Sequence, residues 1–165
     1  MNLCSLVGDD EGENMKPIAI GADDAAFEFR DSIVAYLKQQ GIETFDYSSD
    51  KQAVNSLYPD VANAVAYAIK DKKHDRGILV CGTGIGMAIA ANKVPGIRAA
   101  QCHDVFSAER ARKSNDAHIM TMGARVIGVE LAKKLVQAWL ESEFEGGRST
   151  EKVDRINYYD NLYSK

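Results

Sequence analysis

The chain alternates short apolar runs, rich in β-branched residues, with longer segments whose apolar residues recur at helical spacing. This alternation is typical of βαβ units, in which a helix connects each strand to a parallel neighbour. Strands are expected at Pro17–Ala22, Glu43–Tyr47, Gly77–Cys81, Ile97–Gln101 and His118–Met122. Helices are expected at Ala25–Gln40, Pro59–Lys72, Gly84–Lys93, Val105–Lys113, Val129–Leu140 and between Ser149 and Tyr163. The pattern predicts a three-layer α/β sandwich around a five-stranded parallel sheet.

The length and composition fit one globular domain. With 165 residues, of which 45% are hydrophobic and 27% charged, the chain can bury a substantial core. Residues 1–14 end in the acidic, glycine-containing run Gly8–Asn14, which shows no periodicity. We predict a disordered N-terminal extension over residues 1–14 and a single domain over residues 15–165.

Charge and cysteine content narrow the class of partner. The net charge of −4 gives no general attraction to nucleic acid or to an anionic membrane, so a small molecule is the expected ligand. No apolar run approaches the roughly 20 residues that span a bilayer, and the N-terminus has no secretory signal pattern. Cys4, Cys81 and Cys102 are an odd number without CxxC spacing, which argues against a disulfide framework and a zinc site. We expect a cytoplasmic protein.

The predicted topology selects the residues that border a ligand. In open parallel sheets the ligand crevice lies beyond the carboxyl ends of the strands, where the strand order reverses. The residues that follow the expected strands there are Asp23 and Asp24, Cys81 to Gly86, His103 and Asp104, and Gly123 to Arg125.

The segment Cys81-Gly82-Thr83-Gly84-Ile85-Gly86 joins a strand to a helix through three glycines. Glycines let backbone N–H groups approach a ligand, and a helix N-terminus adds positive potential, so an anion or a developing oxyanion would be stabilised here. The same potential favours the thiolate form of a cysteine at the loop entrance, which can then act as a base or nucleophile. A tight turn with a buried structural cysteine is the alternative interpretation.

Nucleotide-binding motifs do not match this segment. Gly82, Gly84 and Gly86 have the spacing G-x-G-x-G, whereas a dinucleotide fingerprint needs G-x-G-x-x-G. The chain contains no G-x-x-x-x-G-K-[ST] phosphate loop, and Met87 stands where a thiol phosphatase would place its arginine. A nucleotide-binding α/β module remains a third alternative.

Five segments in order carry a family resemblance. They are Gly21–Asp23, Cys81–Gly86, Ala91–Ala99, Ser114–Asp116 and Gly123–Gly128. Together they resemble the type B ribose-5-phosphate isomerases and the related galactose-6-phosphate isomerase subunits. The resemblance implies a Rossmann-like sandwich whose C-terminal helix is used in dimerisation. It also implies a homodimer or tetramer with sites at the subunit interface, which needs neither metal nor cofactor.

The resemblance implies a role for each site residue in a proton transfer through an enediolate. Cys81 would be the catalytic base, Thr83 would assist proton movement between substrate oxygens, and Asp23 would bind an oxygen. The remaining implied substrate contacts are Tyr58, Asn115 and the amides of Gly82, Gly84 and Gly86, with Arg125, Arg148 and Lys152 as phosphate-binding cations. His103, at a strand end, is either a substrate contact or a structural partner of Asp104.

The chain departs from the ribose enzymes at four positions. Ser114 replaces the histidine that usually opens the furanose ring, and Asp24 replaces a histidine near the phosphate. After Arg148 a further histidine is missing, and Lys152 replaces an arginine. The chemistry is therefore expected to be kept, whereas the substrate contacts are expected to differ.

A ketose 4-phosphate with four carbons cannot close a furanose ring, because its phosphate occupies the only hydroxyl in reach. The region Val105–Lys133, with His103-Asp104, also resembles the branch that isomerises D-erythrulose 4-phosphate in erythritol breakdown. Ribose 5-phosphate and D-erythrulose 4-phosphate are therefore two candidate substrates, and a non-catalytic sugar-phosphate-binding subunit is a further alternative.

Two further histidines are not assigned to the site. His74 is expected in a solvated loop and His118 in a structural role.

Overall fold

The structure is a computed structural model that describes residues 15–48 and 57–164. Residues 1–14, 49–56 and 165 lie outside the described part, so the predicted N-terminal extension is not placed. No helix among the described residues has the length and apolar character needed to cross a membrane.

Five parallel strands form one sheet in the order β2-β1-β3-β5-β4. The strands are β1 (Ile18–Ala22), β2 (Thr44–Asp46), β3 (Gly77–Cys81), β4 (Ala99–Gln101) and β5 (Ile119–Gly123). The helices are α1 (Phe27–Gln39), α2 (Tyr58–Lys70), α3 (Ile85–Ala91), α4 (Val105–Lys113), α5 (Val129–Leu140) and α6 (Thr150–Tyr163), with a 3₁₀ turn η2 at Gly147–Ser149. These elements confirm the predicted three-layer α/β fold.

Local chemistry explains where several helices begin and end. Pro59 occupies the first turn of α2, where its missing N–H costs nothing. Gly41 adopts a positive φ of 77° just after α1, which stops that helix. Asp104 precedes α4, and its carboxylate accepts the Ser107 N–H at 2.7 Å.

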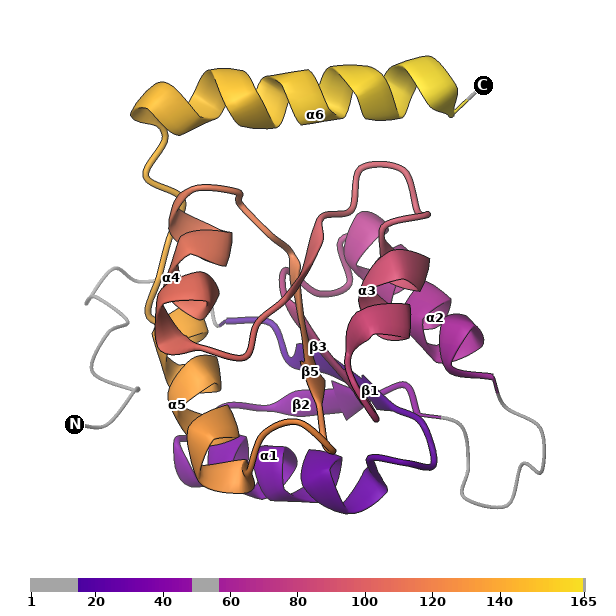
Figure 1. The fold of residues 1–165 in the computed structure, drawn as a ribbon, viewed down its shortest axis with the longest axis vertical. Coiled ribbons are helices and arrows are strands. Elements are labelled where there is room, and N and C mark those ends of the chain that lie inside the picture. The colour runs from indigo at the N-terminus through magenta and orange to yellow at the C-terminus, as the bar shows by residue number, and fades with distance from the viewer. Residues whose placement is uncertain (1–14, 49–56, 165) are drawn as a thin grey trace.

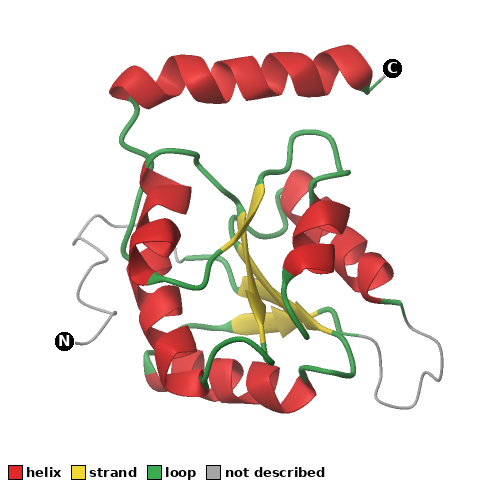
Figure 2. Cartoon of the chain, in the orientation of Figure 1, coloured by secondary structure: helices red, strands yellow, loops and turns green. Residues whose placement is uncertain are grey.

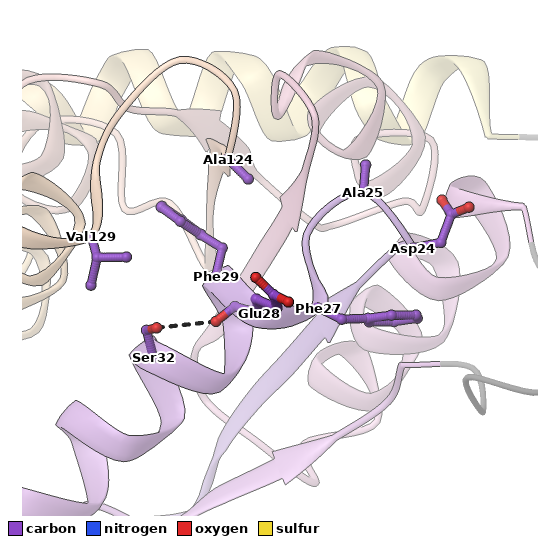
Figure 3. A pocket seen from close by; sticks show the side chains of 8 residues that line it. All are labelled: Asp24, Ala25, Phe27, Glu28, Phe29, Ser32, Ala124 and Val129. Carbon is purple, nitrogen blue, oxygen red and sulfur yellow. Dashed lines mark hydrogen bonds between the residues drawn. The ribbon is translucent and has the colours of Figure 1, made fainter.

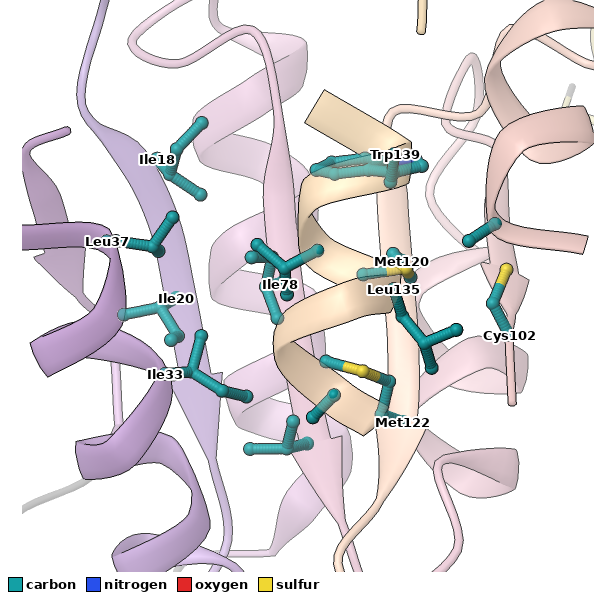
Figure 4. Packing of buried hydrophobic residues seen from close by; sticks show 14 of the residues in the cluster. Ile18, Ile20, Ile33, Leu37, Ile78, Cys102, Met120, Met122, Leu135 and Trp139 are labelled. Carbon is teal, nitrogen blue, oxygen red and sulfur yellow. The ribbon is translucent and has the colours of Figure 1, made fainter. Parts of the chain in front are cut away.

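Helices cover the two faces of the sheet unequally, as Figure 1 shows: α1, α4 and α5 pack on one face, and α2 and α3 on the other. The three central strands are buried along their whole length. Figure 4 shows Ile33, Leu135 and Trp139 from α1 and α5 packed over Ile20 and Ile78 of the sheet. Fully burying a side chain of this size contributes about 1.5–3 kcal/mol. The carboxyl ends of the strands are thus held on a rigid base.

The last helix, α6, lies across the amino-terminal edge of the sheet and stands away from both helical layers (Figures 1 and 2). It is tied to the body by a hydrogen bond from Arg98 Nη1 to Asn157 Oδ1 at 2.9 Å and by one from the Gly96 N–H to Asp160. Val153 is its buried residue, whereas its exposed apolar and aromatic side chains are Ile156, Tyr158, Tyr159, Leu162 and Tyr163. The C-terminal helix is therefore present as predicted, and its use in dimerisation stays a prediction.

Candidate active site

The glycine loop after β3 holds the sulfur of Cys81 in a defined position. Cys81 is the last residue of β3 and only 5% exposed, and its Sγ accepts the backbone N–H of Gly84 at 3.0 Å. Gly84 has a φ of 77°, and a Cβ there would lie 2.8 Å from the carbonyl carbon of Met122. A side chain at this position is excluded by both conformation and space, so Gly84 is required for the contact with the thiol.

The turn after β5 braces this loop. The Ala124 N–H donates to the Cys81 carbonyl at 2.9 Å, and the Arg125 N–H donates to the Gly82 carbonyl at 3.0 Å. A Cβ on Gly123 would lie 2.6 Å from Thr83 Cα, so the two backbones are in direct contact. The pairing of β3 with β5 thus continues past the strand ends and fixes both loops together.

A cation and a carboxylate border the loop. The side chain of Arg125 lies over Gly82, where an added Cβ would be 3.5 Å from Arg125 Cδ. Asp23, just after β1, accepts the Ala25 N–H at 3.1 Å. Partial burial and, more weakly, the Asp24 carboxylate raise the pKa of Asp23, although the Ala25 N–H and Arg125 act in the opposite direction. The sheet therefore brings Asp23, Cys81 and Arg125 to one edge, as predicted.

Tyr58 and Thr83 complete the surroundings of the loop within one chain. A Cβ on Gly86 would be 2.5 Å from the Tyr58 ring, which shows that the ring packs directly on this glycine. Thr83 is exposed, and its Oγ1 accepts the Ile85 N–H at 3.3 Å. An exposed hydroxyl and a phenol therefore lie next to the three glycines of the predicted site.

His103 and Asp104 both make backbone contacts in this structure. His103 Nε2 accepts the Gly123 N–H at 3.0 Å, and Asp104 caps α4. Among the described residues, no hydrogen bond joins His103 to Asp104, and the pKa of Asp104 is lowered mainly by the hydrogen bonds from the Ser107 hydroxyl and N–H. The predicted substrate contact of His103 is not tested by this geometry.

The other predicted site residues lie at the opposite edge of the sheet. Asn115 is in the turn between α4 and β5, so the whole of β5 separates it from Arg125. Five residues of strand span about 16 Å at a rise of roughly 3.3 Å per residue. Arg148 lies in η2 and Lys152 in the first turn of α6, next to the same edge. One chain therefore does not bring Asn115, Arg148 or Lys152 to Cys81.

A pocket of about 640 Å³ opens beside the site (Figure 3). It is lined by Asp24, Ala25, Phe27, Glu28, Phe29, Ser32, Ala124 and Val129. The pocket lies on the α1 side of the loops, whereas Cys81 packs with the α2 and α3 side. None of the lining residues is a predicted site residue, although Asp24 and Ala124 adjoin Asp23 and Arg125.

Two polar residues that contact the glycine loop were missed by sequence reasoning. Gln101 Nε2 donates to the Thr83 carbonyl at 2.7 Å, and Thr121 Oγ1 donates to the Gly84 carbonyl at 2.8 Å. Gln101 ends β4, and Thr121 pairs with it in β5. A polar residue within or at the end of an otherwise apolar strand was the available signal.

The expectation for His74 is wrong, because it is 5% exposed rather than solvated. Its ring nitrogens contact the Tyr47 hydroxyl at 2.8 Å and the Pro17 carbonyl at 2.6 Å. His118 has a structural contact, since its Nδ1 accepts the Arg98 N–H at 3.1 Å. Burial and the nearby Arg98 lower the pKa of His118 to about 4.

A metal site would need a group of at least three His, Cys, Asp or Glu side chains. The described residues contain no such group.

Comparisons with known proteins identify the class of protein that has this fold and this glycine loop. Residues 18–156 match the model of the family described as Ribose/Galactose Isomerase. The D-erythrulose-4-phosphate isomerase of Pectobacterium atrosepticum is 61% identical over 146 residues, which are 88% of this chain and 96% of that protein. The ribose-5-P isomerase B of Listeria innocua is 56% identical over 143 residues, which are 87% and 96% of the two chains.

Solved structures agree with the sequence comparisons. The ribose-5-phosphate isomerase B of Clostridium thermocellum superposes with a TM-score of 0.85 at 42% identity, covering 90% of this chain and 99% of that one. The type B ribose 5-phosphate isomerase of Trypanosoma cruzi gives a TM-score of 0.86 at 35% identity, covering 92% and 100%. The chain belongs to the ribose/galactose isomerase family. It is an aldose–ketose isomerase of a phosphorylated sugar.

Proposed function

We propose that this enzyme interconverts D-erythrulose 4-phosphate and D-erythrose 4-phosphate, with Cys81 as the base. The thiolate takes a proton from C1 of the ketose, and the electron pair of that C–H bond forms the C1–C2 double bond of an enediolate. The same sulfur returns the proton to C2, while a proton moves from the C1 oxygen to the C2 oxygen with help from the Thr83 hydroxyl. The reaction is balanced without an oxidant or reductant.

The contact between Cys81 Sγ and the Gly84 N–H carries the assignment of the base. A backbone N–H aimed at the sulfur at 3.0 Å stabilises a thiolate more than a thiol. The Gly84 N–H is used by the sulfur, so the enediolate oxygen would take its donors from the other backbone N–H groups of the loop, which are held in place before the charge develops. Arg125, which lies over Gly82, supplies a cation for the phosphate.

Ser114 favours the open-chain substrate. It follows the last residue of α4 and is partly buried, and its hydroxyl cannot supply the acid–base group that opening a furanose ring calls for. A tetrulose 4-phosphate has no furanose form, so an enzyme for it needs no such group. The 61% identity to a protein named as a D-erythrulose-4-phosphate isomerase supports this choice.

Ribose 5-phosphate is the second candidate. It is supported by the 56% identity to a protein named as a ribose-5-P isomerase B and by the likeness to solved enzymes of that name. A kinetic comparison of D-erythrulose 4-phosphate, ribose 5-phosphate, allose 6-phosphate and galactose 6-phosphate distinguishes the two candidates. We expect kcat/KM to favour the tetrulose phosphate over ribose 5-phosphate by up to about 10²–10⁴-fold, the usual contribution of an acid–base group. A higher kcat/KM for ribose 5-phosphate would contradict the proposal, and no turnover of any of the four would favour a non-catalytic subunit.

We also propose that two copies of the chain share each site. Cys81 and Arg125 lie at one edge of the sheet, and Asn115, Arg148 and Lys152 lie at the other, so a second copy must supply the missing half. A two-fold dimer does this for both sites at once, because its interface pairs each surface with its counterpart. The exposed apolar side chains of α6, such as Ile156 and Leu162, are next to the half that would be donated.

Mixing two impaired variants tests the shared site. A Cys81→Ser subunit paired with an Arg148→Ala subunit forms one intact site and one doubly defective site. After random reassortment, we expect about a quarter of the wild-type activity at substrate concentrations below KM, because half of the dimers are mixed and each has one working site. The matched control mixes Cys81→Ser with Arg125→Ala, which leaves no intact site. Equal activity in the two mixtures would contradict the shared site.

A further inference from the structure

A single peptide group, between Thr83 and Gly84, connects Gln101 to the sulfur of Cys81. The carbonyl of this peptide accepts Gln101 Nε2 at 2.7 Å, and its N–H donates to Cys81 Sγ at 3.0 Å. Because the peptide is planar, a donor that fixes the direction of the carbonyl also fixes the direction of the N–H. The Gln101 side chain therefore sets the orientation of the N–H that faces the thiol.

The Thr83–Gly84 peptide needs a hydrogen bond to hold its orientation, because it is next to a glycine. Gly84 adopts a φ of 77°, and the peptides on either side of a glycine rotate more freely than others. The next carbonyl, that of Gly84, is held by Thr121 Oγ1 at 2.8 Å. Gln101 and Thr121 are paired residues of β4 and β5, so two neighbouring strands supply donors to two successive carbonyls of the loop.

We infer that Gln101 is a positioning residue for the Cys81 thiolate, which acts on the sulfur through the Thr83–Gly84 peptide. The inference rests on the proposed role of Cys81 as the base. A donor on the carbonyl polarises the amide and strengthens the hydrogen bond that its N–H gives. That bond favours the charged sulfur over the neutral thiol, so losing the Gln101 donor makes the thiolate less stable.

Among the described residues, one titratable or charged side chain from each of four elements around Cys81 is relevant to the loop. They are Asp23 after β1, Tyr58 on α2, His103 after β4 and Arg125 after β5. None of them makes the contact with the Thr83 carbonyl, which belongs to Gln101. A substitution of Gln101 by an uncharged residue leaves these four groups in place, so its effect on the sulfur reports on the peptide.

Alkylation of Cys81 by iodoacetamide, followed over pH by mass spectrometry of its peptide, tests the inference without any substrate. In Gln101→Met, which keeps the length of the side chain and removes the donor, we expect the rate at pH 7 to fall about 3- to 10-fold, the range for one lost hydrogen bond. The plateau at high pH should be unchanged, because the thiolate itself is equally accessible. The control is Gln137→Met, whose amide donates to Glu141 on the surface of α5 at 2.9 Å. We expect its alkylation profile to match that of the wild type.

A purely structural role would change the alkylation rate at all pH values alike or lower the melting temperature alone, and either result would overturn the inference. The kinetic counterpart is a lower kcat in Gln101→Met with KM nearly unchanged. The two proposals fail separately. An unchanged alkylation profile in Gln101→Met overturns the role of Gln101, whereas full turnover in Cys81→Ser overturns the role of Cys81.

Discussion

The imidazole Nε2 of His103 accepts the backbone N–H of Gly123 at 3.0 Å. This hydrogen bond ties the end of β4 to the turn that carries Arg125, and Gly123 itself contacts Thr83 in the glycine loop. A side chain at this position must therefore offer an acceptor to satisfy the Gly123 N–H.

We expect His103→Ala to lower the free energy of unfolding by about 1–3 kcal/mol, because the buried Gly123 N–H loses its acceptor. It should also raise KM, since the turn that holds Arg125 is loosened. His103→Gln, which keeps an acceptor oxygen, should lose less stability. Thermal and denaturant unfolding measure the stability, and an unchanged free energy with a raised KM would indicate that His103 acts on the substrate alone.

The two arginines proposed to bind the substrate phosphate lie at opposite edges of the sheet in one chain. Arg125→Ala and Arg148→Ala should each raise KM by about 10- to 100-fold with a smaller change in kcat, because an ion pair with phosphate forms in the ground state and the transition state alike. Lys38→Ala, which removes an exposed cation in the last turn of α1, is the control and should leave KM unchanged. Unchanged KM in both arginine variants would place the phosphate elsewhere.

Substitution of Ser114 tests the choice between an open-chain and a cyclic substrate. Ser114→His should increase kcat/KM for ribose 5-phosphate more than for D-erythrulose 4-phosphate, because only the pentose has a ring to open. Ser114→Ala is the control, and it should leave the ratio of the two values close to that of the wild type. If Ser114→His does not change the ratio, Asp24 or Lys152 limits the longer sugar, and Asp24→His is then expected to change it.

The sequence predicted the fold closely because its strongest signals are local. Apolar periodicity, Pro59 in a first turn and Gly41 after a helix place elements within two residues of their observed ends. The cluster of Asp23, Cys81 and Arg125 followed from the rule for carboxyl ends of parallel strands. These inferences need only the order of the elements.

What the sequence did not predict depends on contacts between distant segments. Charged neighbours made His74 look solvated, but Tyr47 and the Pro17 carbonyl cover its ring. The donor from Gln101 to the glycine loop depends on the pairing of β4 with β5, which the order of residues does not reveal. The separation of Asn115 from Cys81, in contrast, was implied by the sequence, because the strand predicted at His118–Met122 already lies between Asn115 and Arg125.

Proton transfer by Cys81 is the central claim, and turnover of Cys81→Ser in deuterium oxide tests it most directly. A serine hydroxyl is too weakly acidic to act as a base near neutral pH, so we expect kcat to fall by at least about 10²-fold with the fold intact. Incorporation of solvent deuterium at the substrate carbon should be lost in parallel. The control is Cys102→Ala, since burial and Asp104 raise the pKa of Cys102 to about 12 and keep that thiol protonated. Wild-type kcat and deuterium incorporation in Cys81→Ser would contradict the account.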